Sequence, residues 1–430
     1  YDDKGRRVPS QTGGGTAVLS DGTWQPHVEF VADVPPLSAR RYEIRVDRKP
    51  ASARLPLSIS EDAAGITVEN SWWCARFDRV SAALAELKHR ETGRALLNAP
   101  VRLFAMADVG HAWGGENRAA YNEPVSPFLT LSPEAVGAFA GMEGHSGPAL
   151  RVIASGSVYT TVECLVGWQH TRAALQITFY ADVPYIDIST RLYMQARRKM
   201  IKLALPFALA GLRAVCEVPY GVAERPADAT EFPYARWIRL ETPNMSVGVA
   251  NSGQSGFDVS ADGLLHLSLT RGAVHSSWEG DPGTKPPDLD RPYTYMGQAQ
   301  IDTRFRIVAG VEVEAVTAAL IPAALELNQP LERFFVYHPP AAPEGASSVP
   351  FLDVRPATVV LGALKKAEDG DALIVRLVET ARRRSTARVR LDGGPEQRFR
   401  FTPHQIRTFR VTRQSSGILW QECNLLEEPL

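Results

Sequence analysis

Glycine and proline recur along the whole of this chain, and they leave few places where a helix of ordinary length could form. The 430 residues include 33 Gly and 31 Pro, and both residue types weaken or end helices. The stretches between them are short and rich in apolar and β-branched residues, as is typical of strands. The clearest such runs are residues 42–46, 175–180, 185–193, 247–250, 264–269, 373–378, 387–391 and 408–412. The sequence therefore predicts an all-β protein.

Segment 81–97 permits two interpretations. Its Ala, Leu, Glu and Lys content favours a helix by propensity. Within it, however, the sequence Glu-Thr-Gly-Arg at residues 91–94 is typical of a hairpin turn. Composition alone leaves both interpretations open.

The length of the chain predicts two or three domains, because a single domain rarely exceeds about 250 residues. Proline clusters at residues 49–56 and 329–350 offer the boundaries. We therefore expect an N-terminal β segment over residues 1–55, a large β-sandwich over 56–328 and a smaller C-terminal β-domain over 329–430.

Acidic and basic residues are balanced along the chain. There are 47 Lys and Arg against 48 Asp and Glu, for a net charge of −1. Proteins that bind nucleic acid or anionic membranes usually carry a basic excess, so the balance argues against both partners. The sequence also lacks the run of about 18 apolar residues that a transmembrane helix needs.

The four cysteines, Cys74, Cys164, Cys216 and Cys423, lie far apart and form no C-x-x-C pair. Widely spaced thiols in apolar or β-like surroundings favour buried, reduced cysteines over a disulfide framework. Because reduced thiols persist in the cytoplasm, the sequence predicts a cytoplasmic protein.

Short motifs for metal or phosphate binding are absent from the sequence. There is no H-E-x-x-H or H-x-D, and the nine histidines do not lie at ligand spacing. There is also no G-x-x-x-x-G-K and no G-x-G-x-x-G, the loops that cradle phosphates. We therefore expect no metal site and no cofactor within this chain.

The most specific motif lies near the C-terminus. Residues 361–379 read LGALKKAEDGDALIVRLVE, which resembles the run S-A-x-K-x-A-E-D-G-x-x-x-x-x-R-x-x-E of α-mannosidases of glycoside hydrolase family 38. Physically the run predicts a β-hairpin, with residues 368–371 in the turn. Leu373, Val375 and Leu377 would then line one face of the returning strand.

Further segments resemble the same family in the same order along the chain. They are residues 5–11, 34–42, 68–70, 77–78, 218–221, 224–226, 237, 248–251, 256–259, 267–271 and 405–409. The resemblance implies that segment 81–97 is strand–turn–strand rather than helix. Only the tail, residues 413–430, lies beyond the point where we expect the family to end.

The resemblance implies both a fold and a function. The fold is a galactose-mutarotase-like super-β-sandwich followed by a smaller C-terminal β-sandwich, with a short N-terminal β segment. The function is that of the C-terminal portion of an enzyme that hydrolyses α-mannosides with retention. Its catalytic zinc and Asp nucleophile lie in an N-terminal barrel-like domain that this chain lacks. The chain begins at Tyr1 rather than Met, and we therefore expect it to be a piece of a longer protein.

The expected partners are an α-mannoside and the missing catalytic domain, with assembly into a homo-oligomer left open. We expect no catalytic residue in this chain, but some side chains that reach the sugar pocket. Segment 108–121 combines aromatic, amide, acidic and basic side chains around glycines, a mixture that suits sugar binding. It resembles the D-A-W-[ED]-x-x-x-x-Y segment of the family, although Gly114 stands where an acid is expected. The predicted sugar-binding residues are His111, Trp113, Glu116, Asn117, Tyr121 and Arg271.

Each of these predictions has a structural alternative. Trp113 would serve equally well as a buried residue of a loop, and Arg271, at the arginine of the family's L-L-R motif, as one half of a structural ion pair. Two other functions also remain open. One is a stand-alone carbohydrate-binding sandwich. The other is an aldose epimerase, which would need a His acid, such as His111, His145 or His170, facing a base such as Glu163.

Overall fold

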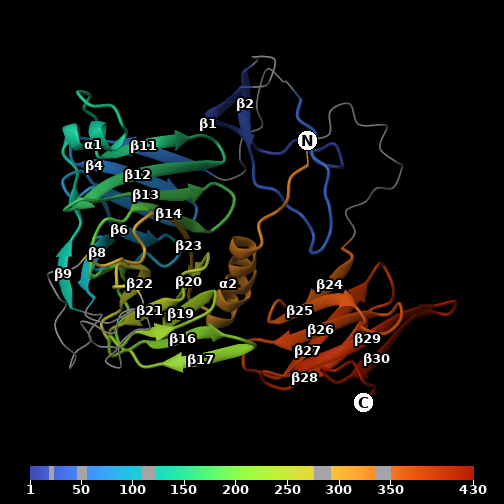
Figure 1. The fold of residues 1–430 in the computed structure, drawn as a ribbon. Coiled ribbons are helices and arrows are strands. Elements are labelled where there is room, and N and C mark those ends of the chain that lie inside the picture. Colours follow the sequence, from blue (N-terminus) through green and yellow to red (C-terminus); the bar gives the residue numbers. More distant parts are fainter. Residues whose placement is uncertain (19–23, 46–55, 109–122, 276–291, 335–349) are drawn as a thin grey trace.

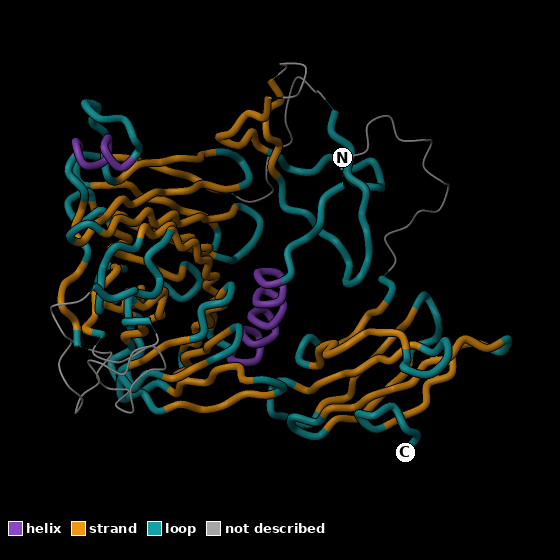
Figure 2. The backbone as a smooth tube through the Cα atoms, viewed as in Figure 1, coloured by secondary structure: helices purple, strands orange, loops and turns teal. Residues whose placement is uncertain are grey.

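The computed structural model describes residues 1–18, 24–45, 56–108, 123–275, 292–334 and 350–430. Within these ranges the protein is almost entirely β-structure, with only two helices, as Figure 2 shows. The predicted fold class is therefore confirmed. All the runs predicted as strands lie in or overlap strands, except the run 42–46. In its described part, residues 42–45, Tyr42 forms only an isolated bridge to Asp2.

The large sandwich has a ten-stranded antiparallel sheet as one layer (Figure 1). In spatial order its strands are β10 (Leu129–Thr130), β12 (Tyr159–Trp168), β13 (Thr171–Tyr180), β14 (Ile186–Tyr193), β23 (Gln300–Gly310), β20 (Met245–Asn251), β19 (Trp237–Thr242), β16 (Arg213–Val218) and β17 (Gly221–Arg225), with β11 (Leu150–Ser155) paired to β12.

Two smaller antiparallel sheets form the facing layer. The six-stranded sheet runs β18 (Phe232–Pro233), β21 (Gly256–Val259), β22 (Leu264–Arg271), β15 (Lys199–Pro206), β8 (Arg102–Ala107) and β9 (Pro124–Pro127). The five-stranded sheet runs β3 (Leu57–Glu61), β4 (Gly65–Asn70), β5 (Trp73–Asp78), β6 (Ala83–His89) and β7 (Arg94–Ala95).

One hydrophobic core joins the three sheets, because alternate residues of each strand point into the space between the layers. Ile188 of β14 and Leu203 of β15 are fully buried in this core from opposite layers. Phe77 of β5 and Phe179 of β13 meet there edge to face, with ring centroids 6.2 Å apart. The same alternation leaves a second face on each sheet, and these outer faces carry the polar clusters described below.

Segment 81–97 forms β6, a turn and β7, so the strand–turn–strand interpretation is confirmed and the helix is wrong. Leu84 and Leu87 are buried in the core, and Gly93 turns the chain with φ of 67°. Burial of these leucines in the sandwich outweighs the modest helix propensity of the segment.

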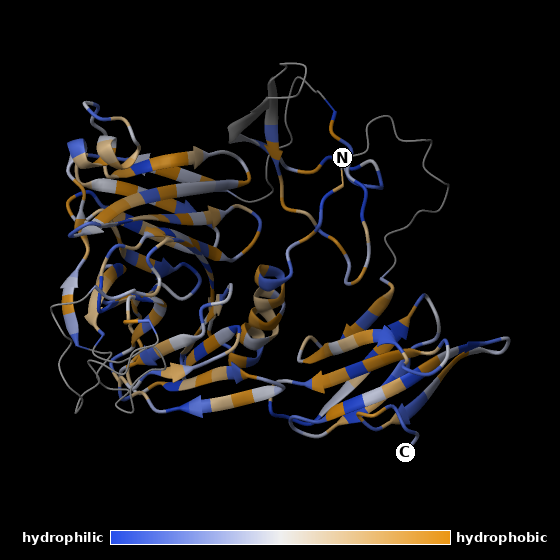
Figure 3. Cartoon of the chain, in the orientation of Figure 1, coloured by the Kyte–Doolittle hydropathy of each residue, from blue (hydrophilic) through white to orange (hydrophobic). Residues whose placement is uncertain are grey.

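Helix α2 (Val313–Asn328) was not predicted from the sequence. It packs on the outer face of the ten-stranded sheet, where Leu320 contacts a cluster that includes Trp237 and Val308. Gly248 of β20 makes this approach feasible, because a Cβ at that position would lie 2.6 Å from Leu320 Cδ2. Figure 3 shows the apolar character of the helix. The second helix, α1 (Pro133–Phe139), is capped by Ser132, whose Oγ accepts a hydrogen bond from the Ala135 N–H at 3.2 Å.

The C-terminal region contains a three-stranded and a four-stranded sheet around a separate core that includes Val375, Leu377 and Phe409. The first sheet runs β24 (Leu352–Arg355), β27 (Ser385–Leu391) and β28 (Gln397–Phe401), and the second runs β25 (Val359–Lys366), β26 (Leu373–Glu379), β29 (Ile406–Gln414) and β30 (Gly417–Cys423). The predicted hairpin of residues 361–379 is confirmed as β25 and β26, with Gly370 in the turn at φ of 76°.

The N-terminal region has little regular structure. Residues 5–10 lie outside any strand, and β1 (Gln11–Val18) pairs with β2 (Trp24–Glu29). A side-chain bond attaches this region to the sandwich, because Gln11 Oε1 accepts hydrogen bonds at 2.9 Å from the N–H groups of both Val158 and Tyr159.

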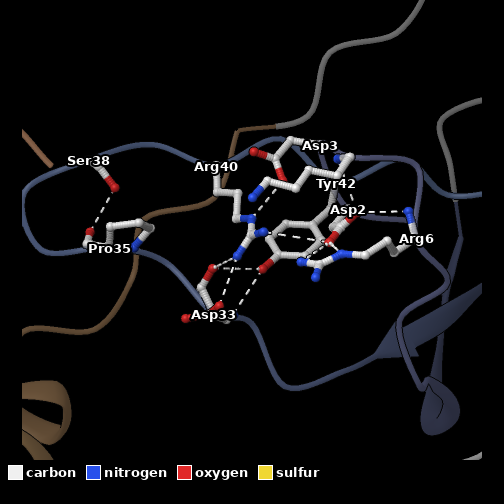
Figure 4. Close-up of polar contacts among 9 residues, drawn as sticks. Asp2, Asp3, Arg6, Asp33, Pro35, Ser38, Arg40 and Tyr42 are labelled. Atoms are coloured by element: carbon white, nitrogen blue, oxygen red, sulfur yellow. Dashed lines mark hydrogen bonds and ion pairs between the residues drawn. The ribbon is translucent and has the colours of Figure 1, made fainter. Parts of the chain in front are cut away.

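A cluster of charged side chains holds the N-terminal loops together (Figure 4). Arg40, whose side chain is only 6% exposed, bonds Asp3 through Nε at 2.8 Å and Asp33 Oδ2 through a terminal nitrogen at 3.0 Å. Asp2 accepts hydrogen bonds from the Arg6 Nε at 2.7 Å and from the Arg6 N–H at 2.8 Å. Because these loops have few strand hydrogen bonds, we infer that the cluster fixes their path.

Acid is expected to loosen this cluster. Burial alone would raise the pKa of Asp2, but the hydrogen bonds from Arg6 and from the Lys4 N–H outweigh it and lower the pKa to about 2. A folded-state pKa below the unfolded value of about 4 means that the ionised carboxylate stabilises the fold at neutral pH. That contribution is lost as the pH falls from about 4 toward 2.

Hydrogen exchange of the N-terminal peptide, corrected for the intrinsic pH dependence, should therefore show a loss of protection over this range. An Asp2→Asn variant should lack protection even at pH 7. Asp371→Asn, at a side chain that is 97% exposed, serves as the control and should behave as the parent chain does. Unchanged N-terminal protection at pH 2 would contradict the role given to Asp2.

Candidate functional site

Most of the sugar-binding residues predicted from the sequence fall in one segment. His111, Trp113, Glu116, Asn117 and Tyr121 lie outside the residues that the structure describes, and their role stays a prediction. Arg271 is described, and so is Asp108, the first residue of the same motif.

Arg271 and Asp108 form an ion pair at one end of the six-stranded sheet. Asp108 directly follows β8, and Arg271 is the last residue of β22. The guanidinium donates to the two carboxylate oxygens at 2.8 and 3.1 Å, in the bidentate arrangement that favours arginine over lysine. The Asp108 side chain is fully buried, whereas that of Arg271 is 21% exposed. The buried carboxylate thus orients an arginine that solvent can still reach.

Strand β15 lies between β8 and β22 in the sheet, so it separates the strand that precedes Asp108 from the strand that ends at Arg271. Backbone hydrogen bonds near the start of β15 connect the two strand ends. Arg198, just before β15, takes a positive φ of 53°, and its N–H donates to Gly272 O at 2.7 Å. Asp108 N–H in turn donates to Arg198 O at 3.3 Å. These backbone bonds fix the position of the ion pair at the end of the sheet.

A second charged cluster lies further along the outer face of the six-stranded sheet. It was not predicted from the sequence. Lys202 of β15 is fully buried, and its Nζ lies 2.5 Å from both Glu231 Oε2 and Asp258 Oδ2. His266 Nδ1 lies 2.9 Å from Asp258 Oδ1, and Ser268 Oγ donates to Glu231 Oε1 at 2.5 Å. The only signal in the sequence is a lysine inside the apolar run MIKLALP, residues 200–206, because a buried lysine needs a carboxylate partner.

The outer face of the ten-stranded sheet contains a cavity of about 450 Å³ between β11, β12, β13, β14, β23 and α1. Glu163 lies on its wall, hydrogen-bonded by Arg151 and Gln176. None of the residues that line this cavity is a histidine. Among the described residues, then, the cavity does not supply the His and Glu pair that an aldose epimerase would need.

The described residues contain neither a metal-binding group nor a membrane-spanning helix. No group of three or more His, Cys, Asp or Glu side chains there is arranged to hold a metal ion, so these residues do not fit a zinc site. Neither helix found in the described ranges is long and apolar enough to span a bilayer. The four cysteines are free, and Cys164, Cys216 and Cys423 are buried as predicted, whereas Cys74 is only half-buried.

Comparison with solved structures finds matches to most of the chain. An α-mannosidase from Enterococcus faecalis matches 95% of this chain at 13% identity and a TM-score of 0.67, over 50% of its own length. A protein in glycosyl hydrolase family 38 from the same organism matches 95% at 12% identity and a TM-score of 0.69, over 52% of its length. This chain therefore spans about half the length of these structures. A galactose mutarotase-like protein from Lactobacillus casei matches 58% of the chain at 10% identity, with a TM-score of only 0.32.

Comparison with protein families gives two matches, whereas no curated protein sequence matches the chain. Residues 68–288 match the "Glycosyl hydrolases family 38 C-terminal domain". Residues 358–430 match the "Glycosyl hydrolases family 38 C-terminal beta sandwich domain". The second match includes the tail, where β30 pairs with β29, so the expectation that residues 413–430 lie beyond the family is wrong. The chain belongs to glycosyl hydrolase family 38, of which it carries the C-terminal β-domains.

Proposed function

We propose that this chain is the C-terminal portion of an enzyme that hydrolyses α-mannosides with retention, and that a catalytic domain outside it carries the nucleophile and the zinc ion. The supporting observation is that 95% of the chain matches only half of an α-mannosidase structure. In this proposal the sandwich supports the catalytic domain and contributes side chains to its sugar pocket.

Arg271 is the described residue that we expect to reach the sugar. A guanidinium can hydrogen-bond two neighbouring hydroxyl groups at once, and its charge strengthens both bonds. The buried Asp108 carboxylate would act as a positioning residue, because it restricts the rotation of the Arg271 side chain. This pairing would lower the entropic cost of binding a hydroxylated ligand.

The test of the proposed function is hydrolysis of p-nitrophenyl α-mannoside. The 430-residue chain alone should be inactive, with or without added zinc. A protein in which a family 38 catalytic domain precedes the chain should hydrolyse the substrate and release α-mannose first, as proton NMR would show. Clear turnover by the chain alone, or inversion by the longer protein, would refute the proposal.

An Arg271→Ala variant of the longer protein should lose about tenfold to a hundredfold in kcat/KM, as expected for a charged hydrogen bond of about 1.5–3 kcal/mol. Asp108→Asn should show a smaller loss, mainly in KM, because the arginine remains but is less well oriented. Arg213→Lys is the control, at an ion pair with Glu224 in which both side chains are largely exposed. If Arg271→Ala lowered stability but left kcat/KM unchanged, the Asp108 pair would be purely structural.

A second candidate is a stand-alone carbohydrate-binding sandwich. The cavity on the outer face of the ten-stranded sheet is the observation that favours it, since binding there would need no second domain. Saturation-transfer NMR with mannose oligomers on the chain alone would separate the two proposals, because the first does not require the isolated chain to bind sugar.

A further inference from the structure

The outer face of the ten-stranded sheet is divided between two environments. Helix α2 covers the part formed by β19, β20 and β23 with an apolar cluster. On β11 to β14 and the start of β23, the same face carries polar side chains around the cavity of about 450 Å³. This volume lies within the range of about 300–1,000 Å³ that small-molecule sites occupy. The residues that line the cavity all belong to the sandwich and are all described in the structure.

One wall of the cavity consists of three planar polar groups on three adjacent strands. Glu163 of β12 lies opposite Arg151 of β11 and opposite Gln176 of β13 in the strand register. Arg151 Nε donates to Glu163 Oε1 at 2.8 Å, and Gln176 Nε2 donates to Glu163 Oε2 at 2.9 Å. The Glu163 side chain is only 7% exposed. These contacts hold a carboxylate, an amide and a guanidinium in fixed positions before any ligand arrives.

Further charges in the cavity also come mainly as pairs. Arg191 of β14 lies opposite Asp302 of β23, and its Nε donates to Asp302 Oδ1 at 3.2 Å. Arg304 adds one further positive charge to the lining. Because each lining carboxylate already has an arginine partner, the cavity offers no cluster of unpaired cations for a phosphate group. It suits a neutral ligand with many hydroxyl groups instead.

An aromatic pair forms part of the apolar lining of the cavity. Phe139 at the end of α1 and Tyr193 at the end of β14 meet edge to face, with ring centroids 5.3 Å apart. Tyr193 is 37% exposed, so part of its ring is open to a ligand. Sugars present apolar C–H faces beside their hydroxyl groups, and aromatic rings next to planar polar groups match that combination.

The geometry points to a binding site for a short neutral saccharide in this cavity. Glu163 and Gln176 would bond hydroxyl groups, and Tyr193 would pack on the C–H face of a sugar ring. This inference rests on the second candidate function and deepens it by assigning the ligand and its contact residues. It goes beyond the proposed hydrolysis, since it concerns binding by the sandwich without a catalytic domain. It is tested on the chain alone, so its failure and the failure of the proposed hydrolysis can be told apart.

The experiment is titration of the 430-residue chain with mannotriose, with maltotriose and with inorganic phosphate, followed by calorimetry and saturation-transfer NMR. We expect binding of at least one trisaccharide and none of phosphate. Tyr193→Ala should weaken saccharide binding about tenfold or more, since it removes the exposed ring. Gln176→Ala should weaken it as well, while circular dichroism checks that both variants remain folded.

A control variant locates the site. Tyr220→Asn removes another exposed tyrosine, on the β16–β17 hairpin, and Asn tolerates the positive φ of 58° there. This variant should bind as the parent chain does. The inference is overturned if neither saccharide binds, if phosphate competes, or if Tyr193→Ala binds as the parent chain does. The last result alone would leave the second candidate function standing.

Discussion

Replacement of Lys202 by Met is expected to lower the free energy of unfolding by about 3–5 kcal/mol. Met matches the four-atom stem of Lys and omits only the ammonium group, so the packing of the stem changes little. The ammonium group, however, is the cation that lies 2.5 Å from both Glu231 and Asp258 on the outer face of the six-stranded sheet. Without it, two largely buried carboxylates are left facing each other. Part of the loss is then the cost of burying charge that no cation compensates.

Denaturant unfolding followed by circular dichroism would measure this effect. Lys88→Met is the matched control, because the Lys88 Nζ lies 3.6 Å from Glu86 and both side chains are more than half exposed. That variant should lose less than about 1 kcal/mol. Adding Glu231→Gln and Asp258→Asn to Lys202→Met should recover part of the stability. Equal losses at Lys202 and Lys88 would show that the buried cluster contributes nothing.

Removal of Glu379 should have the second largest effect on stability. This residue ends β26 and is fully buried. Its carboxylate accepts hydrogen bonds from three backbone N–H groups, those of Ala381 at 2.9 Å, Arg383 at 3.2 Å and His404 at 3.1 Å. It therefore joins the turn after β26 to the turn before β29. Glu379→Ala leaves these donors without an acceptor and should cost about 3 kcal/mol.

Glu379→Gln is the informative companion, because the amide keeps only one acceptor oxygen and should lose roughly half as much. Glu396→Ala is the control, at a carboxylate that is 32% exposed and bonded by Arg398 at 3.1 Å. Denaturant unfolding gives the free energies, and hydrogen exchange of β26 and β29 would show where protection is lost. Full stability of Glu379→Ala would contradict the role given to the three hydrogen bonds.

The sequence predicted the fold class because its strand signals are local. Runs such as residues 264–269 carry alternating apolar side chains, and the alternation survives in β22 as buried and half-buried positions. The hairpin at residues 361–379 followed from a turn sequence between two apolar runs. Helix α2 escaped prediction because Pro322 interrupts its pattern. The helix is stabilised by burial of Leu320 and its neighbours against the sheet. This is a tertiary interaction, which helix propensities of single residues do not include.

Less of the site could be predicted. Arg271 was named from a motif, but its partner Asp108 lies 163 positions earlier in the chain, and only strand order brings the two together. Lys202, Glu231 and Asp258 likewise come from separate segments. The cavity wall depends on the register of β11, β12 and β13, which determines that Glu163 faces Arg151 and Gln176. Single-sequence patterns indicate which face a residue occupies, but they do not give the register between strands.

The attachment of the N-terminal region to β12 has a mechanical consequence. Gln11 binds the backbone of Val158 and Tyr159, and the Tyr159 hydroxyl bonds Glu29. A force applied at the N-terminus would therefore reach the ten-stranded sheet through these hydrogen bonds. Motion of a domain joined ahead of Tyr1 would be coupled to the sandwich for as long as the Gln11 contacts held.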